Sequence, residues 1–137
     1  MDELGLIAAL NDLVDTWKSR NEAINCHFSI KLIENNLTET INLALYRLVQ
    51  EALTNISRHA KASMITIKII TENRHQKTGV MVKINDNGVG FNPNHSDGFG
   101  LPGMRERVEG LGGTFAIGTR LKHGTTLTAW VPLTHVN

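Results

Sequence analysis

The order in which helix-like and strand-like hydrophobic patterns follow one another is the feature that most limits how this chain can fold. Residues 3–20 carry apolar side chains at helical spacing, whereas residues 26–33 alternate between apolar and polar side chains as a half-buried strand does. A second helix is predicted from Thr38, a good N-cap residue, to about His59. The remaining predicted segments are strands at 64–71, 79–86, 113–119 and 125–131, a loop at 87–98, and a short helix at 101–110.

This order predicts an α+β fold, a two-layer sandwich in which helices cover one face of a mixed β-sheet. A chain of 137 residues has the size of one compact domain, so we expect residues 1–137 to form a single domain. The formal net charge of +1 argues against a nucleic-acid-binding protein, which would carry a concentrated basic face. No apolar run is long enough to span a bilayer, and the single cysteine, Cys26, suits a reducing compartment. We therefore expect a cytoplasmic location without direct membrane contact.

A polar stripe on the predicted long helix holds an acid, an amide and two possible cations, which are Glu51, Asn55, Arg58 and His59. Their spacing places all four beside the apolar face of an α-helix, where the rim of a pocket would lie. An amide oxygen is a hard neutral ligand for Mg²⁺, and a carboxylate one turn away could orient a nucleophile. Arg58 and His59 could contact phosphate oxygens. A solvated helix face, with His59 simply a polar residue near the helix end, is the alternative interpretation.

A first glycine loop follows the strand predicted at 79–86 and has the sequence Asp86-Asn87-Gly88-Val89-Gly90. An acid followed by two glycines also occurs in ordinary turns, so this pattern alone is unspecific. In the functional interpretation, Asp86 accepts a hydrogen bond from an amino group such as that of adenine. Gly88 and Gly90, which lack a Cβ atom, would let the backbone approach a flat ring closely.

A second glycine loop, Gly98 to Gly103, matches the pattern G-x-G-x-x-G. A dinucleotide-binding fold needs this pattern directly after its first strand and an acid about 20 residues later. Here most of the domain precedes the loop, and no Asp or Glu follows Glu109, so that interpretation fails. A glycine-rich loop that leads into a helix N-terminus remains, and its free amides suit phosphate oxygens. Gly124-Thr125-Thr126 opens the last predicted strand and could equally be part of a plain hairpin.

Taken in this order, the segments resemble the ATP-binding (Bergerat-type) fold shared by histidine kinases, DNA gyrase B, Hsp90 and MutL. Residues 51–60 resemble the N box of histidine kinases, residues 86–90 the G1 box, and residues 98–107 the G2 box. The form of the boxes is typical of the nitrate-sensor and hexose-phosphate-sensor subfamily. The resemblance covers the chain from about residue 24 and implies the α+β fold predicted above.

The resemblance also implies roles for individual residues. Glu51 would assist the acceptor imidazole, and Asn55 would hold Mg²⁺. Asp86 would bind adenine, and Gly98 and Gly100 would admit the phosphates of ATP. The remaining positions expected to contact the nucleotide are Arg58, His59, Gly88, Gly90, Leu101 and Thr125.

The phosphoacceptor of the family, a histidine on a long dimerisation helix, has no counterpart upstream of these boxes. We therefore expect a catalytic domain whose partner is a separate dimerisation domain, with the helix at 1–20 at the junction between the two. The partner served indirectly would be a response regulator with a helix-turn-helix output domain, and the parent protein would be anchored in the inner membrane. The segment between the G1 and G2 boxes, about Phe91 to Asp97, is short and lacks a phenylalanine-rich F box.

Three other functions are compatible with such boxes. An ATP-hydrolysing clamp of the gyrase or Hsp90 type would use the acid to activate water. A serine kinase of the anti-sigma type would need no dimerisation helix. A purely structural interaction domain would have lost nucleotide binding, although the retention of all three boxes argues against it. The leading prediction is a protein histidine kinase domain that uses ATP and Mg²⁺.

Overall fold

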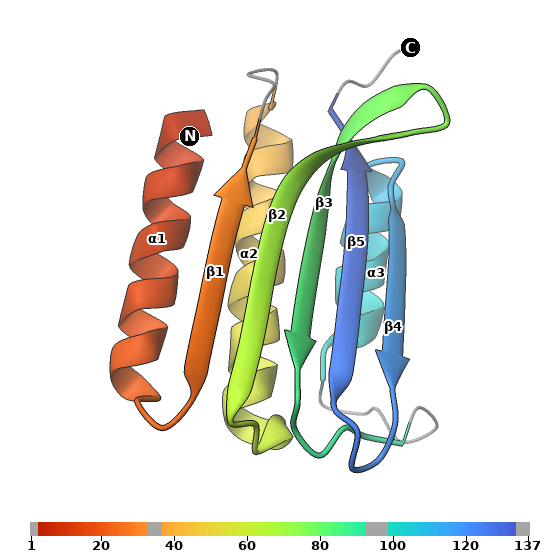
Figure 1. The fold of residues 1–137 in the computed structure, drawn as a ribbon. Coiled ribbons are helices and arrows are strands. Elements are labelled where there is room, and N and C mark those ends of the chain that lie inside the picture. The colour runs from red at the N-terminus through yellow and green to blue at the C-terminus, as the bar shows by residue number, and fades with distance from the viewer. Residues whose placement is uncertain (1–2, 33–36, 93–98, 134–137) are drawn as a thin grey trace.

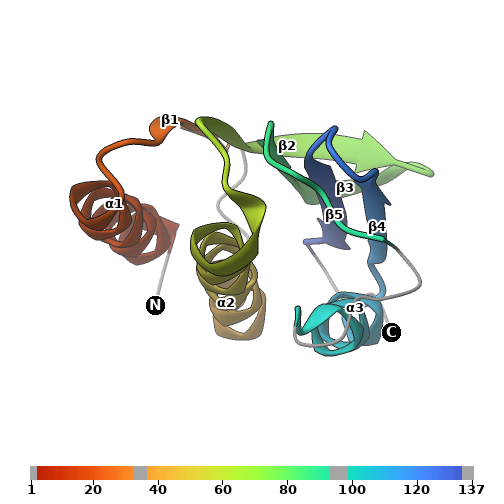
Figure 2. The ribbon, with the colours of Figure 1, turned by 90° about the horizontal axis from the view of Figure 1, so that it is seen from below.

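The computed structural model describes residues 3–32, 37–92 and 99–133 of the chain. Within these residues, five strands form one sheet in the order β1-β2-β3-β5-β4, and three α-helices lie on one of its faces (Figures 1 and 2). β1 runs parallel to β2, whereas the other neighbouring pairs are antiparallel. The predicted α+β sandwich with a mixed sheet is confirmed. The elements are α1 (Glu3–Arg20), β1 (Asn25–Lys31), α2 (Glu39–Asn55), η1 (Ile56–Ala60), β2 (Met64–Arg74), β3 (Lys77–Asp86), α3 (Leu101–Gly110), β4 (Thr114–Thr119) and β5 (Thr125–Pro132).

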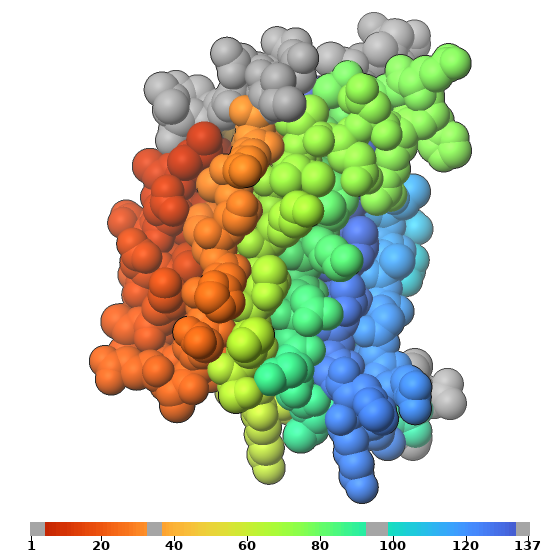
Figure 3. Space-filling model, viewed as in Figure 1, coloured from red at the N-terminus to blue at the C-terminus, as the bar shows by residue number. Residues whose placement is uncertain are grey.

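The hydrophobic core lies between the sheet and the helices. Alternation along β2 directs Ile65, Ile67 and Ile69 into this core, where each is 0% exposed, while Thr66 and Lys68 between them are exposed. Figure 3 shows the other face of the sheet, where the strands themselves form the surface of the molecule. None of the described helices is both long enough and apolar enough to cross a membrane.

The first helix packs against the second and is fastened to its C-terminal end. The buried side chains of α1 are Leu6, Leu10, Val14 and Trp17. The indole Nε1–H of Trp17 donates to the carbonyl oxygen of Leu53 at 3.1 Å and to the hydroxyl of Ser57 at 2.7 Å. These bonds satisfy the polar atom of a buried Trp and connect α1 to the segment that carries the predicted N box.

The second helix begins as predicted but changes its winding near its end. The hydroxyl of Thr38 accepts a hydrogen bond from the backbone N–H of Ile41 at 3.2 Å, which confirms it as the N-cap residue. Regular α-helix stops at Asn55, and Ile56–Ala60 form the π-helical turn η1, followed by Lys61 in a left-handed conformation with φ 49°. The predicted end at His59 is therefore right in extent but wrong in winding, because local spacing does not distinguish an α-turn from a π-turn.

The hairpin between β2 and β3 is longer than predicted, since both strands run past their expected ends. The two residues that connect them, His75 and Gln76, have positive φ values of 51° and 64°, as a two-residue hairpin turn requires. Neither is Gly or Asn, so the composition carries no turn signal. The extension brings the backbone carbonyl of Glu72 within 2.8 Å of the Trp130 indole nitrogen. Gly79 leaves room for that indole, because a Cβ atom there would lie 2.4 Å from it.

Candidate functional site

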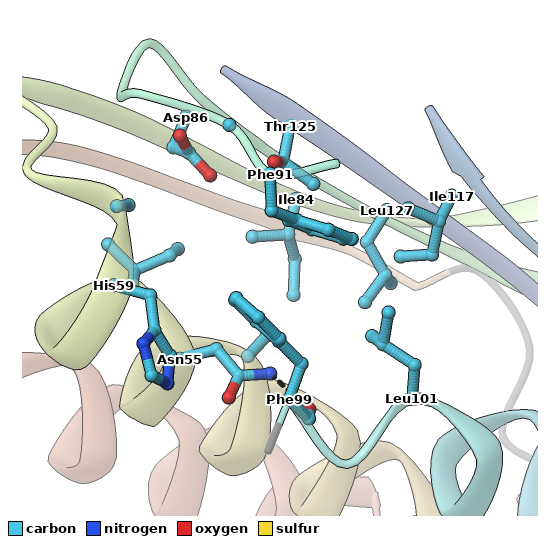
Figure 4. Close-up of a pocket in the computed structure, with 14 residues that line it drawn as sticks. Asn55, His59, Ile84, Asp86, Phe91, Phe99, Leu101, Ile117, Thr125 and Leu127 are labelled. Carbon is cyan, nitrogen blue, oxygen red and sulfur yellow. Dashed lines mark hydrogen bonds between the residues drawn. The ribbon is translucent and has the colours of Figure 1, made fainter. Parts of the chain in front are cut away.

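A pocket opens between the end of α2, the turn η1, the ends of the central strands and the start of α3 (Figure 4). Its floor is apolar and is formed by Ile84 of β3, Ile117 of β4 and Leu127 of β5. Its polar lining side chains are Asn55, His59, Asp86 and Thr125. An apolar cavity with a few convergent polar groups is the usual form of a small-molecule site.

Asp86, the last residue of β3, supplies a buried carboxyl group to the pocket. It is 7% exposed, and Figure 4 shows the carboxyl group directed toward the pocket. One carboxyl oxygen accepts the Gly88 N–H at 2.8 Å, and the backbone N–H of Thr125 also binds this group. Burial raises the pKa of Asp86 above its usual value, and the two hydrogen bonds oppose that shift. A buried acceptor in an apolar pocket selects a ligand that donates hydrogen bonds, such as an amino group on a flat ring.

The loop after Asp86 is held close to neighbouring backbone at two glycines. A Cβ atom on Gly88 would lie 2.0 Å from the carbonyl oxygen of Ala60, and one on Gly90 would lie 1.9 Å from that of Arg120. Gly90 also has φ +64° and lines the pocket, whereas Gly88 is not among the lining residues. Gly88 is required by its contact with the π-turn, and the approach of either glycine to a ligand stays a prediction.

Thr125 and its neighbour Thr119 hold the chain that leaves the glycine loop. Their hydroxyl groups lie 2.9 Å apart, and the Thr119 hydroxyl accepts the backbone N–H of Phe91 at 3.0 Å. Because the Thr125 backbone also binds Asp86, Thr125 and Thr119 together connect the buried carboxyl group to the segment that carries Phe91.

Asn55 lies on the helix side of the pocket, across from Asp86 (Figure 4). Its side-chain amide donates to the backbone carbonyl of Phe99 at 2.6 Å. This bond uses the amide nitrogen, so the amide oxygen is the hard neutral donor that a partly neutralised Mg²⁺ ion accepts. The chemistry of this one side chain is compatible with the predicted Mg²⁺, and metal binding stays a prediction.

Two phenylalanine rings line the pocket together with Asn55 and Asp86. The rings of Phe91 and Phe99 are stacked with centroids 4.5 Å apart, and the Phe99 ring lies 4.4 Å from the His59 ring. The cavity left beside them measures about 50 Å³, whereas sites for drug-sized ligands measure roughly 300–1,000 Å³. A ligand of that size needs more room than this cavity provides, and displacement of a ring would enlarge it. Phe99, which follows a predicted phosphate-binding glycine, is the ring held between the other two.

Only part of the predicted polar stripe reaches this pocket. Asn55 and His59 line it, Arg58 is exposed and outside it, and Glu51 instead forms an ion pair with Arg107 of α3. The π-turn accounts for Arg58, because its hydrogen bonds span five residues and place His59 and Ala60 on the pocket side after Asn55. The α-helical spacing predicted that all four side chains lie along one face, and this placement is wrong for Arg58.

The second glycine loop is described from Phe99 onward, and Gly98 lies outside the described residues. Gly100 precedes α3 with φ +66° and makes no side-chain cap, and its carbonyl accepts the Met104 N–H at 3.1 Å. Leu101, the first residue of α3, lines the pocket. Phosphate binding by the amides at this helix start stays a prediction.

The family model described as Histidine kinase-, DNA gyrase B-, and HSP90-like ATPase matches residues 40–135. The chain belongs to this ATPase family. The matched region includes the helix with Asn55, the strand end with Asp86 and the start of α3. The match supports the predicted use of ATP.

Curated relatives of this family member are sensor kinases. The chain is 36% identical over 137 residues to the signal transduction histidine-protein kinase/phosphatase UhpB of Salmonella typhimurium, covering 99% of this chain and 26% of that protein. It is 40% identical over 136 residues to the histidine-protein kinase/phosphatase DegS of Brevibacillus brevis, covering 98% and 34%. The oxygen sensor histidine kinase NreB of Staphylococcus carnosus is 30% identical over 138 residues, with 98% and 38% covered. The predicted resemblance to sensor histidine kinases is confirmed, and the chain spans between about a quarter and two fifths of these relatives.

Solved structures of histidine kinases share the fold of this ATPase family member. The histidine kinase domain of the blue-light activated kinase from Erythrobacter litoralis EL346 superposes with a TM-score of 0.69 at 19% identity, covering 93% of this chain and 61% of that one. The histidine kinase AdeS of Acinetobacter baumannii superposes with a TM-score of 0.66 at 16% identity, covering 93% and 64%. At such identities the likeness concerns the fold alone.

Three residues of the site were missed from the sequence of this family member. Phe91 and Phe99 stand directly beside glycines of the two loops, where a large apolar side chain is unexpected for a solvated turn, and this was the available signal. No sequence feature indicated Arg107, because its partner Glu51 is 56 residues away and no local spacing relates them.

Proposed function

We propose that this chain is the ATP-binding catalytic domain of a bacterial two-component sensor histidine kinase. It transfers the γ-phosphoryl group of ATP to a histidine on a separate dimerisation domain, for relay to a response regulator with a helix-turn-helix output domain. The observation that carries the proposal is one pocket, in the fold of this ATPase family, with a buried carboxyl group at Asp86 and an amide at Asn55 on opposite sides.

The sheet side of the pocket binds and orients the base. Asp86 accepts a hydrogen bond from the amino group of adenine, and the flat ring lies on the apolar floor formed by Ile84 and Leu127. Gly90 allows the loop backbone to run beside the ring, and Thr125 holds the Asp86 carboxyl group in place through its backbone N–H. A buried, prearranged acceptor discriminates against bases that offer no donor at this point.

The helix side holds the phosphates. The Asn55 amide oxygen binds Mg²⁺, and His59 and the amides around Gly98, Gly100 and Leu101 contact phosphate oxygens. ATP with Mg²⁺ supplies the phosphoryl group in a charge-neutralised form, so the protein contributes mainly position and electrostatics. Glu51, one helical turn before Asn55, orients the acceptor imidazole with its carboxylate.

The rest of the parent protein is inferred from the same assignment. Residues 1–137 form a single catalytic domain, and α1 connects it to the dimerisation domain that carries the phosphoacceptor histidine. The parent is anchored in the inner membrane, and this domain works on the cytoplasmic side without contacting lipid or nucleic acid. The length of the relatives, which is two and a half to four times that of this chain, supports additional domains.

The test is phosphoryl transfer in trans. The purified chain is mixed with a dimerisation domain taken from a relative such as DegS and with γ-labelled ATP. The proposal predicts an acid-labile, alkali-stable label on the histidine of the added domain. Release of free phosphate with ATP-dependent dimerisation of the chain would favour a clamp instead, and label on a serine of a protein substrate would favour a serine kinase.

A further inference from the structure

The contact that connects the second and third helices assigns a role to a residue outside the pocket. We propose that Arg107 is a positioning residue, whose guanidinium group holds the Glu51 carboxylate in the orientation that acts on the acceptor imidazole. The inference rests on the proposed function, because Glu51 has an imidazole to orient only when a phosphoacceptor histidine docks beside the bound nucleotide.

The ion pair is specific in its geometry. Nη2 of Arg107 donates a hydrogen bond to Oε2 of Glu51, and the two side chains come from α3 and α2, which flank the pocket. The side chain of Arg107 is 36% exposed and that of Glu51 37% exposed. The carboxylate is therefore open enough for another domain to reach it.

The surroundings favour Arg107 over other cations as the partner of Glu51. Arg47 precedes Glu51 by four residues on α2 and is exposed, yet Glu51 pairs with the cation of the other helix. Arg105 is used elsewhere, since it donates to the Phe115 carbonyl at 3.0 Å.

The chemistry of the transfer explains why a fixed carboxylate is useful. One imidazole nitrogen forms a bond to the γ-phosphorus while the bond from that phosphorus to the bridging oxygen breaks and ADP leaves. The other imidazole nitrogen keeps its proton and donates it in a hydrogen bond to Glu51. A guanidinium group on Oε2 leaves Oε1 to accept that bond, and its permanent charge and planar form hold the carboxylate in one direction.

The position of Arg107 also relates the carboxylate to the nucleotide. Arg107 belongs to the same ten-residue helix as Leu101, which lines the pocket. A short helix moves as a unit, so contact of a nucleotide with Leu101 and placement of Glu51 by Arg107 depend on one element. The orientation of the Glu51 carboxylate then depends on the helix that the nucleotide itself contacts.

The experiment measures transfer to the added dimerisation domain and, separately, ATP affinity by calorimetry on the chain alone. The variants are Arg107→Ala, Arg107→Lys, Glu51→Gln and the double variant Glu51→Gln with Arg107→Ala. The matched control is Arg47→Ala, which removes an exposed arginine one turn before Glu51. Rates are measured over a range of ATP concentrations, so that kcat and KM are obtained separately.

We expect Arg107→Ala to lower kcat about tenfold, a part of the roughly 10²–10⁴-fold that a positioned acid–base group contributes, with ATP affinity and KM within about twofold of the wild type. Arg107→Lys should recover part of the rate, Arg47→Ala should transfer as the wild type does, and the double variant should be no slower than Glu51→Gln. Unchanged kcat in Arg107→Ala, a parallel loss of ATP affinity, or a double variant slower by the product of both effects would overturn the inference. No transfer by the wild type, with ATP still bound, would instead overturn the proposed function and the inference with it.

Discussion

Removal of the Phe99 ring is predicted to tighten nucleotide binding, although the ring lines the site. Phe99 lies between His59 and Phe91 beside the space that a base would enter, and the pocket that these rings line measures about 50 Å³. Binding therefore includes the displacement of this ring from its two neighbours. In Phe99→Ala those two ring contacts are already absent, so the nucleotide has less to displace.

The size of the effect follows from the two ring contacts. Centroid distances of 4.4 Å and 4.5 Å are those of paired aromatic rings, and each such pair is worth about 0.5–1.5 kcal/mol. Phe99 is only half-buried, so we take the lower part of the range, about 1–2 kcal/mol for both contacts. That energy corresponds to a dissociation constant about 5- to 30-fold lower. The hydrogen bond from Asn55 goes to the Phe99 backbone carbonyl and is retained in the variant.

The assay is a calorimetric titration of the purified chain with ATP in the presence of Mg²⁺. The matched control is Phe28→Leu, which removes an aromatic ring from the edge of the core in β1, away from the lining residues of the pocket. The control should bind as the wild type does. An affinity of Phe99→Ala equal to or weaker than that of the wild type would refute the reasoning that this ring competes with the nucleotide.

Three further outcomes are expected. Asp86→Asn should raise the free energy of unfolding at pH 7, because burial raises the pKa of this carboxyl group and ionisation therefore destabilises the folded state. In urea unfolding, the wild type should lose stability relative to the variant as the pH rises through that pKa. Parallel stability curves at all pH values would contradict this. Gly90→Ala should lower the free energy of unfolding by more than about 2 kcal/mol, since φ is +64° and the new Cβ would meet the Arg120 carbonyl at 1.9 Å. In the same measurement, Gly118→Ala, whose Cβ would have nothing within 4 Å, should change the free energy of unfolding by no more than about 0.5 kcal/mol. Asn55→Ala should remove the dependence of ATP affinity on Mg²⁺, and an undiminished dependence in titrations with and without the ion would argue against Asn55 as the ligand.

The layer structure was predictable because it depends on local periodicity. The spacing of apolar side chains in 3–20 and 64–71, and the N-cap at Thr38, identify elements whose existence the structure confirms. The ends of these elements were less predictable. The π-turn Ile56–Ala60 and the turn at His75 are decided by tertiary contacts, and neither is marked by Gly or Pro.

The site was predictable only for residues whose own side-chain chemistry suits nucleotide or metal binding. Asp86, at the end of a strand, and Asn55, on a helix, were identified from the sequence, and the structure brings them to one pocket. The ion pair of Glu51 with Arg107 and the ring stack around Phe99 depend on how α3 and its preceding loop pack against α2. The ion pair and the contact of Phe99 with His59 join residues more than 35 positions apart, so no spacing rule indicates them.

The central claim is that the pocket between Asn55 and Asp86 binds ATP. The most direct measurement is a titration of the purified wild-type chain with ATP and Mg²⁺, repeated with Asp86→Asn. The account predicts saturable binding of one ATP per chain by the wild type, and loss of that binding when the buried carboxyl group becomes an amide. Absence of binding by the folded wild type, or equal binding by both proteins, would contradict it.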